Sequence, residues 1–274
     1  MTVDLHHGDC IDVLRTLPAN SVDSVVTSPP YAMQRKSTYG GILEKDYPEW
    51  TVAWMREVRR VLKDDGSVII NISPHVKNGE LSDYVLRTRL ALREAGWTEL
   101  EELIWHKPDA APVGNTRRPR RSWEHLLWFG KHGKPYVDPY AAGEPPKAKS
   151  GSTTNRASRN GWGHAIGWRK NGKGYTENKI SRVPNHITLP TVRANGVDHP
   201  AMFPWQLAEW CGKLITPPGG TILDPFTGSS STGVAAIRNG WNFIGIDQSA
   251  EYIDMSRKRL NAELANTTTE ETLF

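Results

Sequence analysis

Strand and helix patterns alternate near both ends of the chain, and this alternation restricts the fold more than any other feature. Near the N-terminal end, a helix pattern over 11–17 leads into a β-rich run over 22–26. Near the C-terminal end, a strand over 221–223, a helix over 233–239 and a strand over 242–246 follow one another. Strands and helices of these lengths are typical of βαβ units, whose strands lie parallel in one sheet. The sequence therefore predicts an α/β fold.

The segment between these ends continues the alternation as far as Gly130. Apolar residues recur at helical spacing over 49–62, and 67–72 is an apolar run typical of a buried strand. Two late strand patterns, 101–106 and 125–129, have no helix between them and favour an antiparallel hairpin. We expect a mostly parallel sheet of seven strands with this hairpin at one edge. A last helix is expected over about 250–264.

Periodicity disappears between 131 and 196. This stretch holds 12 of the 34 lysines and arginines of the chain but only three of its 30 acidic residues. A long stretch without periodicity inside a compact protein is usually functional or disordered. Its positive charge indicates either contact with a polyanion or a solvated basic loop, and the charge alone leaves both interpretations open.

Cysteine usage and hydropathy argue against several classes of protein. No apolar run reaches the roughly 18 residues that a membrane span needs, and the first residues lack the pattern of a signal peptide. Cys10 and Cys211 lie far apart and form no CxxC, so neither a disulfide framework nor a zinc site is indicated. We expect a cytoplasmic protein without a metal.

The C-terminal βαβ unit has the layout of a nucleotide site. Its first strand runs into Asp224-Pro225-Phe226-Thr227-Gly228, and its second strand ends at Asp247, 19 residues after Gly228. An acidic residue at that place can bind ribose hydroxyls. The turn lacks the GxGxxG pattern that pyrophosphate requires, which favours a ligand without pyrophosphate. A purely structural turn is the alternative.

A second motif, Ser28-Pro29-Pro30-Tyr31, follows the strand over 22–26. The prolines fix the backbone, so that the carbonyl oxygens of Ser28 and Pro29 can serve as rigid acceptors. Tyr31 offers a flat ring suited to stacking on a base. Acceptors aimed at an exocyclic amino group would favour its attack, because they stabilise the charge that develops on the nitrogen. Taken alone, the tetrapeptide could equally be a turn.

Together the two motifs resemble those of the DNA amino-methyltransferases, whose catalytic motif is D/N/S-P-P-Y/F and whose cofactor loop is D-P-F-x-G-S-G. The resemblance extends over nearly the whole chain outside the basic stretch and includes the segments 8–10, 121–125 and 199–204. The order of the motifs is similar to that of the permuted β-class. It implies a circularly permuted, Rossmann-like methyltransferase fold, in which the strand before Asp9 lies beside the strand that ends at Asp247.

The resemblance also implies S-adenosylmethionine as cofactor and assigns roles to single residues. Ser28 and Pro29 would take the target amino group, and Tyr31 would stack on a base flipped out of the duplex. The catalytic residues expected are Ser28, Pro29, Pro30 and Tyr31. The cofactor-binding residues expected are Asp9, Cys10, His199, Pro200, Phe203, Asp224, Phe226, Gly228, Ser229 and Asp247.

Within the cofactor set, Asp9 would hold the adenine amino group and Asp247 the ribose hydroxyls, while 199–203 would close over the methionine end. Asp224, Phe226 and Gly228 would border the methionine and ribose. The chain departs from the family pattern at Ser230, which stands where the family usually has a second glycine. A positive φ at this serine would be strained.

Contacts with double-stranded DNA are expected from two basic segments. The cluster over 116–121 fits phosphate contacts, with an ordinary exposed loop as the alternative, and 131–196 is interpreted as the target-recognition region. The methyltransferase domain would comprise 1–130 and 197–265, followed by a flexible tail over 266–274. The DNA-binding residues expected are Arg117, Arg118, Arg120, Arg121, Arg169, Lys170 and Lys173.

These features predict a site-specific DNA methyltransferase that transfers a methyl group directly to an exocyclic amino nitrogen, without a metal. Serine at position 28 slightly favours N4 of cytosine over N6 of adenine. No Pro-Cys pair is present, which argues against the covalent route of C5-cytosine enzymes. A catalytically inactive DNA-binding protein and an RNA or protein methyltransferase are the alternatives. The resemblance further suggests a restriction–modification setting, a location at the nucleoid and pairing into a homodimer.

Overall fold

The computed structural model describes most residues of the chain. The chain divides into two compact units. One unit contains 1–138 and 184–274, and the other contains 139–183. The ranges described are 1–34, 40–111, 117–143, 180–192 and 203–271. The sheet, the helices and the candidate site treated below all belong to the first unit.

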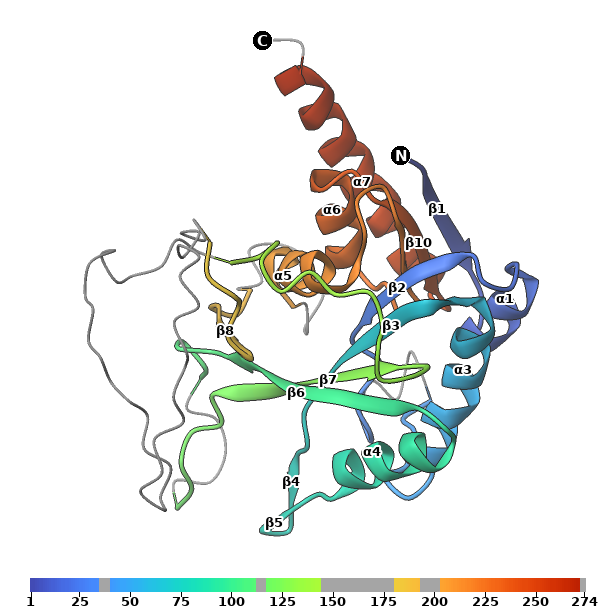
Figure 1. Ribbon diagram of the computed structural model, residues 1–274. Coiled ribbons are helices and arrows are strands. Elements are labelled where there is room, and N and C mark those ends of the chain that lie inside the picture. Colours follow the sequence, from blue (N-terminus) through green and yellow to red (C-terminus); the bar gives the residue numbers. More distant parts are fainter. Residues whose placement is uncertain (35–39, 112–116, 144–179, 193–202, 272–274) are drawn as a thin grey trace, which may run out of the picture. The chain divides into compact units, whose positions relative to one another are not determined.

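Among the described residues, eight strands form one sheet, in the order β1-β10-β9-β2-β3-β7-β6-β8 (Figure 1). Neighbouring strands are parallel except where β7 pairs with β3 and with β6. The expected α/β fold with a mainly parallel sheet is therefore confirmed. The strands are β1 Val3–His7, β2 Val22–Thr27, β3 Leu62–Ile72, β6 Thr98–His106, β7 Trp123–Gly130, β8 His186–Thr188, β9 Thr221–Asp224 and β10 Asn242–Asp247.

The expected number of seven strands and the expected edge are wrong. β6 and β7 do pair antiparallel, but β8 adds an eighth strand parallel to β6 and takes the edge position. The indole of Trp105 donates to the Leu189 carbonyl at 3.0 Å, which holds this segment on β6. A strand of three residues is too short to show alternation, so its pairing is visible only in the folded chain. These contacts place 186–189 on the sheet.

Two groups of helices cover the two faces of the sheet (Figure 1). The first group is α1 Cys10–Thr16, α3 Tyr47–Val61 and α4 Tyr84–Glu94. The second group is α5 Trp205–Ile215, α6 Ser231–Arg238 and α7 Ala250–Glu271. A separate antiparallel pair, β4 Val76–Lys77 with β5 Glu80–Leu81, follows the end of β3.

The last helix is longer than expected, because α7 continues past Leu264 to Glu271. The continuation is polar and gives no apolar repeat from which its length could be predicted. Local bonds support it: Arg238 pairs with Glu263 at 2.5 Å, and the Thr267 hydroxyl donates to the Glu263 carbonyl at 3.0 Å.

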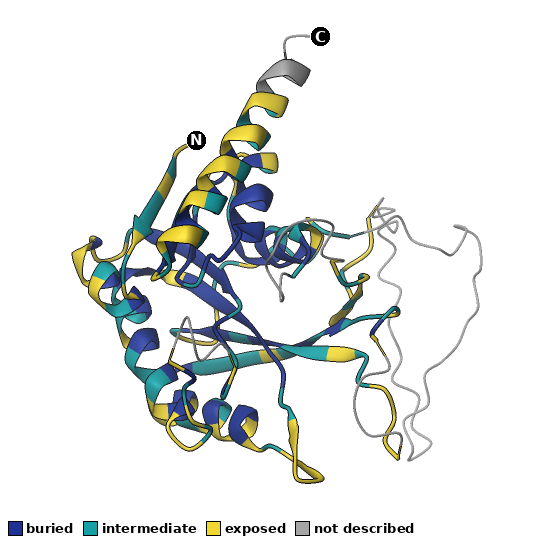
Figure 2. Cartoon of the chain, turned by 180° about the vertical axis from the view of Figure 1, so that it is seen from behind, coloured by how far each residue is buried: buried dark blue, intermediate teal, exposed yellow. Residues whose placement is uncertain are grey.

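Buried residues concentrate along the central strands of the sheet (Figure 2). Every residue of β2 is buried, and α3 turns the side chains of Trp54, Met55 and Val58 into the core. On the other face, α6 approaches β10 closely at Gly233. A Cβ atom there would lie 2.8 Å from the Phe243 ring, so a larger residue would force the elements apart.

The topology brings the expected motifs to one edge of the sheet. The parallel strands β1, β10, β9 and β2 all end at this edge, which is where open α/β sheets bind ligands. β1 pairs with β10 so that His7 lies opposite Asp247, and the Gly8 amide donates to the Asp247 carbonyl at 2.9 Å. The predicted placement of the strand before Asp9 beside the strand ending at Asp247 is thereby confirmed.

Candidate active site

Asp224 joins the end of β2 to the turn that follows β9. Its Oδ1 accepts from the Thr27 hydroxyl at 2.6 Å and from the Phe226 amide at 3.1 Å. Its Oδ2 accepts from the Thr232 hydroxyl at 2.8 Å. Because Thr27 directly precedes Ser28, the two motifs are held together by one carboxylate.

Burial dominates the electrostatics of Asp224, whose exposed fraction is 1 %. Desolvation raises its pKa to about 6, against the hydrogen bonds from Thr27 and Thr232, which favour the ionised form. The nearby negative charge of Asp247 adds a smaller increase to the pKa. The carboxylate therefore ionises at a cost to the folded state, which is typical of a group kept for a role at a site.

The turn after Asp224 has the strained backbone that the sequence predicts. Ser230 has φ 63° and ψ 45°, and Gly228 has φ 51°. A non-glycine residue in this left-handed region costs about 1–2 kcal/mol. The Ser230 hydroxyl lies 2.9 Å from that of Thr227, and the Ser230 amide donates to the Thr227 carbonyl at 2.7 Å. These bonds stabilise the turn.

Side chains of α7 hold the same turn from outside. The Ser256 hydroxyl donates to the Gly228 carbonyl at 2.6 Å. The Arg259 guanidinium donates to the Ser229 carbonyl at 2.8 Å and reaches the Ser231 hydroxyl at 3.4 Å. Ser231 in turn donates to the carbonyl of Phe203 at 2.8 Å. The turn is thus fixed by contacts that no local pattern predicts.

The carboxylate of Asp247 is also buried, with an exposed fraction of 1 %. Its Oδ2 accepts from the Gly228 amide at 2.9 Å, and its Oδ1 accepts from the Ser249 amide at 2.9 Å. Asp247 therefore ties the cofactor turn to the segment that follows β10.

A cavity of about 130 Å³ lies at this edge of the sheet. Asp9, an expected cofactor residue, lines it beside the Trp50 ring, whose centroid lies 5.5 Å from that of Phe226. Flat aromatic and apolar walls with an acid at the rim fit the adenine of S-adenosylmethionine. The lining residues are Asp9, Cys10, Ile42, Trp50, Pro225, Phe226 and Gln248.

Sequence reasoning missed Ile42, Trp50 and Gln248 as lining residues. Trp50 is part of the helical pattern of α3, where an aromatic residue is usually a core residue. Gln248 follows Asp247, and Ile42 lies in a loop, so neither belongs to a recognisable motif.

The catalytic tetrapeptide follows β2 at the same edge. Pro29 and Pro30 are buried, whereas Ser28 and Tyr31 are partly exposed. The Tyr31 hydroxyl donates to Glu124 Oε2 at 2.6 Å. Burial raises the pKa of Tyr31 well above its usual value, and the charge of Glu124 raises it further, so the phenol stays neutral.

The cysteines are unsuited to nucleophilic catalysis. Cys10 and Cys211 are both free and buried, and burial raises the pKa of each thiol. A buried thiol with a raised pKa forms little thiolate, which is the reactive species. This agrees with the missing Pro-Cys pair.

The described arginines of the basic cluster contact backbone carbonyls of neighbouring loops. Arg120 donates to the Ala110 carbonyl at 3.2 Å, Arg118 to the Gly79 carbonyl, and Arg121 to the Pro74 carbonyl. Arg117, Arg118 and Arg120 are exposed. The expected residues His199, Pro200, Arg169, Lys170 and Lys173 lie outside the described residues.

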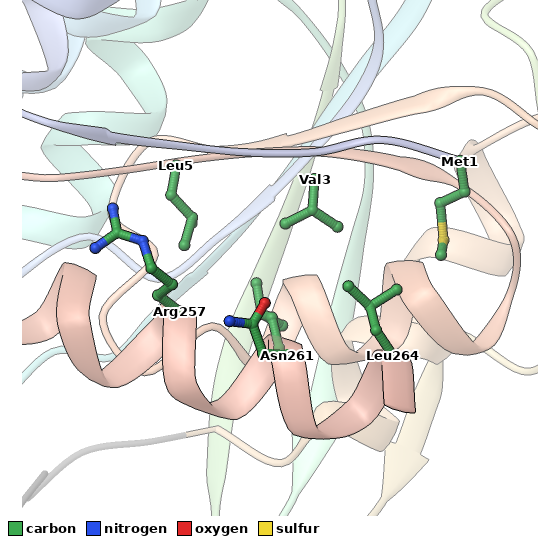
Figure 3. Close-up of a pocket in the computed structure, with 7 residues that line it drawn as sticks. Met1, Val3, Leu5, Arg257, Asn261 and Leu264 are labelled. Carbon is green, nitrogen blue, oxygen red and sulfur yellow. The ribbon is translucent and has the colours of Figure 1, made fainter. Parts of the chain in front are cut away.

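A larger cavity, of about 370 Å³, lies between β1 and α7 (Figure 3). Val3 and Leu5 point from the strand toward the helix, and Leu264 lines the far side. None of the expected site residues lines it.

Across the described ranges, no group of three or more His, Cys, Asp or Glu side chains could hold a metal ion. Within the same ranges, no helix has the length and apolar character needed to cross a bilayer.

Comparison with known proteins identifies the family. The DNA methylase family model matches residues 22–258. The chain is 32 % identical to the type II methyltransferase M.XycI of Xanthomonas campestris pv. cyanopsidis, over 96 % of this chain and 89 % of the relative. It has the same identity and coverage with the type II methyltransferase M.Cfr9I of Citrobacter freundii.

Solved structures share the fold. PvuII DNA methyltransferase (cytosine-N4-specific) superposes with a TM-score of 0.72 at 23 % identity, covering 97 % of this chain and 92 % of that chain. The M1.HpyAVI–SAM complex superposes with a TM-score of 0.62 at 22 % identity, covering 95 % of this chain and 100 % of that chain.

The chain therefore belongs to the DNA methylase family. It is a site-specific DNA methyltransferase that depends on S-adenosylmethionine. The family, the enzyme class and the cofactor expected from the sequence are confirmed.

Proposed function

We propose that the enzyme methylates N4 of cytosine in double-stranded DNA and that Ser28 and Pro29 receive the amino group. The observation that carries this proposal is serine, rather than aspartate, at the end of β2, one residue after the Thr27 that bonds to Asp224. Similarity to a solved methyltransferase described as cytosine-N4-specific supports the choice of base.

The chemistry follows from the weakness of the nucleophile. An exocyclic amino group delocalises its lone pair into the ring, and fixed oxygen acceptors restore its reactivity by stabilising the positive charge that develops on nitrogen. When bound, S-adenosylmethionine would supply an electrophilic methyl group on a sulfonium centre, and its sulfur would leave as the thioether of S-adenosylhomocysteine. The methylated nitrogen would then lose its proton to solvent. The chain itself orients the amino group: buried Pro29 and Pro30 hold the backbone rigid, and the Tyr31 ring stacks on the flipped base.

Cofactor binding is proposed to use the cavity and the turn together. Asp9 would accept a hydrogen bond from the adenine amino group, and the adenine ring would lie against Trp50 in the cavity. Asp247, which ends β10 at the edge of the sheet where ligands of α/β proteins bind, would accept from the ribose hydroxyls. Cys10, Phe226, Gly228 and Ser229 would line this path, with Asp224, His199, Pro200 and Phe203 nearer the methionine end.

Nucleoside analysis of methylated DNA tests the choice of atom. DNA incubated with enzyme and cofactor is digested, and the methylated nucleosides are separated by mass spectrometry. We expect N4-methylcytosine from the wild type and a loss of at least about 100-fold in rate for Pro29→Ala, as for other fixed electrostatic groups. Ser21→Ala, at the opposite end of β2, is the matched control. Detection of N6-methyladenine would show that the proposed base is wrong. Detection of 5-methylcytosine would show that the methylated atom is not an amino nitrogen.

The basic stretch over 131–196 is proposed as the target-recognition region, with Arg169, Lys170 and Lys173 on DNA phosphates. The region would be joined to the methyltransferase domain of 1–130 and 197–265. The flexible tail that the sequence predicts over 266–274 is wrong as far as Glu271, because these residues continue α7. Changing the three cations together to glutamine should reduce the salt dependence of DNA affinity by about 0.9 in logarithmic slope for each phosphate that is no longer neutralised. An unchanged slope would contradict the assignment. In the matched control, three exposed arginines on α1, α4 and α7 are changed to glutamine, and the slope should stay that of the wild type. These arginines are Arg15, Arg87 and Arg257.

The basic cluster of Arg117, Arg118, Arg120 and Arg121, of which the first three are exposed, is proposed to contact phosphates near the edge of the sheet that carries the tetrapeptide. A methyltransferase that acts on the chromosome works where that DNA lies, so we place the enzyme at the nucleoid of the cytoplasm. We further propose that two copies pair, as the resemblance suggests. Sedimentation equilibrium of the purified protein would show one chain per particle if this is wrong.

A further inference from the structure

Three side chains outside the tetrapeptide form a hydrogen-bonded cluster that includes the hydroxyl of Tyr31. Glu124 Oε2 accepts from this hydroxyl at 2.6 Å. The amide of Asn71 donates to the same carboxylate oxygen at 3.0 Å and to the Tyr31 oxygen at 3.1 Å. The ammonium of Lys107 lies 2.6 Å from Glu124 Oε1. The Glu124 carboxylate is thus the centre of the cluster, with partners on both oxygens.

Strand direction explains why these residues meet. β2 and β3 run parallel, so Tyr31 and Asn71 lie toward the same edge of the sheet. β7 runs antiparallel to β3, so its beginning, with Glu124, returns to that edge. β6 is antiparallel to β7 and ends there too, followed by Lys107. The cluster therefore belongs to the edge that carries the catalytic tetrapeptide.

The charges in the cluster favour a fixed geometry. The side chains of Glu124 and Lys107 are each only 13 % exposed. The Lys107 ammonium donates to the carboxylate, and hydrogen bonds between charged groups are shorter and stronger than those between neutral ones. Lys107 also lies over the ring of Trp105, with its nitrogen 5.4 Å from the ring centroid. Both oxygens of the carboxylate are consequently restrained, and the Tyr31 phenol that bonds to one of them is restrained as well.

We propose that Glu124 is a positioning residue for methyl transfer: its carboxylate holds the Tyr31 hydroxyl and thereby fixes the plane of the ring that stacks on the flipped base. The inference rests on the proposed stacking role of Tyr31. A tyrosine ring turns about two side-chain torsions, and a charge-assisted hydrogen bond at its far end restricts both. Small misplacements of a reacting group can lower a rate by about 100-fold, so the orientation of this ring matters for the reaction.

Glu124→Gln tests the proposal, because the amide keeps the shape but cannot accept at both ends. Single-turnover methyl transfer to DNA is measured at saturating DNA and cofactor. We expect about a tenfold lower rate with unchanged dissociation constants, since the substitution removes a charge-assisted bond and leaves the groups that bind DNA and cofactor in place. Tyr31→Phe should lower the rate by a similar factor. The double variant should be no slower than the slower single variant, because both changes break the same bond.

The proposal would be overturned if the rate reduction of the double variant equalled the product of the two single reductions. A wild-type rate for Glu124→Gln would overturn it as well. Glu102→Gln is the matched control: Glu102 lies on β6, pairs with His125 at 2.6 Å and has no bond to Tyr31 among the described residues. Its rate should remain that of the wild type.

Fluorine NMR of protein labelled with 3-fluorotyrosine gives a readout that does not depend on activity. The Tyr31 resonance is identified by its disappearance in Tyr31→Phe. It should shift and broaden in Glu124→Gln and stay in place in Glu102→Gln, and an unmoved resonance in Glu124→Gln would overturn the proposal. Methyl transfer to adenine would overturn the proposed choice of base while leaving this test intact, because total methyl transfer is counted.

Discussion

Asp224→Asn removes a negative charge from the buried side chain that joins the end of β2 to the turn after β9. The amide oxygen can accept from the Thr27 hydroxyl and the Phe226 amide, as the carboxylate does. The amide nitrogen would face Thr232, whose hydroxyl lies 3.3 Å from the Val26 carbonyl and can donate there instead. All hydrogen bonds can therefore be kept while the charge is removed.

The magnitude follows from the raised pKa of Asp224. In the unfolded chain the carboxyl has a pKa of 3.8, and in the folded protein burial raises the pKa to about 6. At about 1.4 kcal/mol per pH unit, this difference corresponds to about 3 kcal/mol. The pKa of Asp224 is higher in the folded protein than in the unfolded chain, so its protonated carboxyl stabilises the folded state by this amount below pH 3.8. The contribution is lost as the pH rises through about 6. The variant, which carries no charge, avoids this loss.

Urea unfolding of the protein without cofactor measures the free energy of unfolding for both chains. We expect the variant to be more stable by about 1–3 kcal/mol at about pH 8 and the difference to disappear toward about pH 4. Asp12→Asn is the matched control, because it removes the same charge from the exposed side of α1. A variant that is less stable than the wild type at the higher pH, or a difference that stays constant with pH, would refute the reasoning.

Two further substitutions test the cavity and the packing. Trp50→Ala removes a wall of the cavity beside Phe226, and calorimetry should show that the free energy of cofactor binding is weaker by about 1.5–3 kcal/mol. Trp50→Phe should recover part of the lost binding energy. Equal cofactor affinities of Trp50→Ala and the wild type would contradict the adenine site. Gly233→Ala places a Cβ 2.8 Å from Phe243 and 2.9 Å from Leu260, so unfolding should cost about 1–3 kcal/mol less. An unchanged free energy of unfolding would show that α6 can move away without loss.

Local patterns were enough to predict the fold class and the two motifs. The alternation of periods over 11–26 and 221–246 reports which residues face the core, and it does so segment by segment. Asp224 and Ser28 follow apolar strands directly, so their place at strand ends could be predicted without knowing how the strands pair. The strain at Ser230 could be predicted as well, because a turn that usually takes glycine needs a positive φ.

Contacts between distant segments were decided by the tertiary structure alone. β8 is too short to show a pattern and exists because β6 offers an unpaired edge. Asp247 and the cofactor turn are joined by a backbone amide of Gly228, which carries no sequence signal.

The same holds for the residues around Tyr31. Glu124 and Lys107 approach it because β7 and β6 reverse direction, and strand direction is a property of the whole sheet. The sequence by itself therefore determined most of the elements and the position of the tetrapeptide after β2, because turn chemistry and periodicity are local. Which side chains hold that tetrapeptide in place was decided by strand order and register, which depend on the burial of the whole sheet.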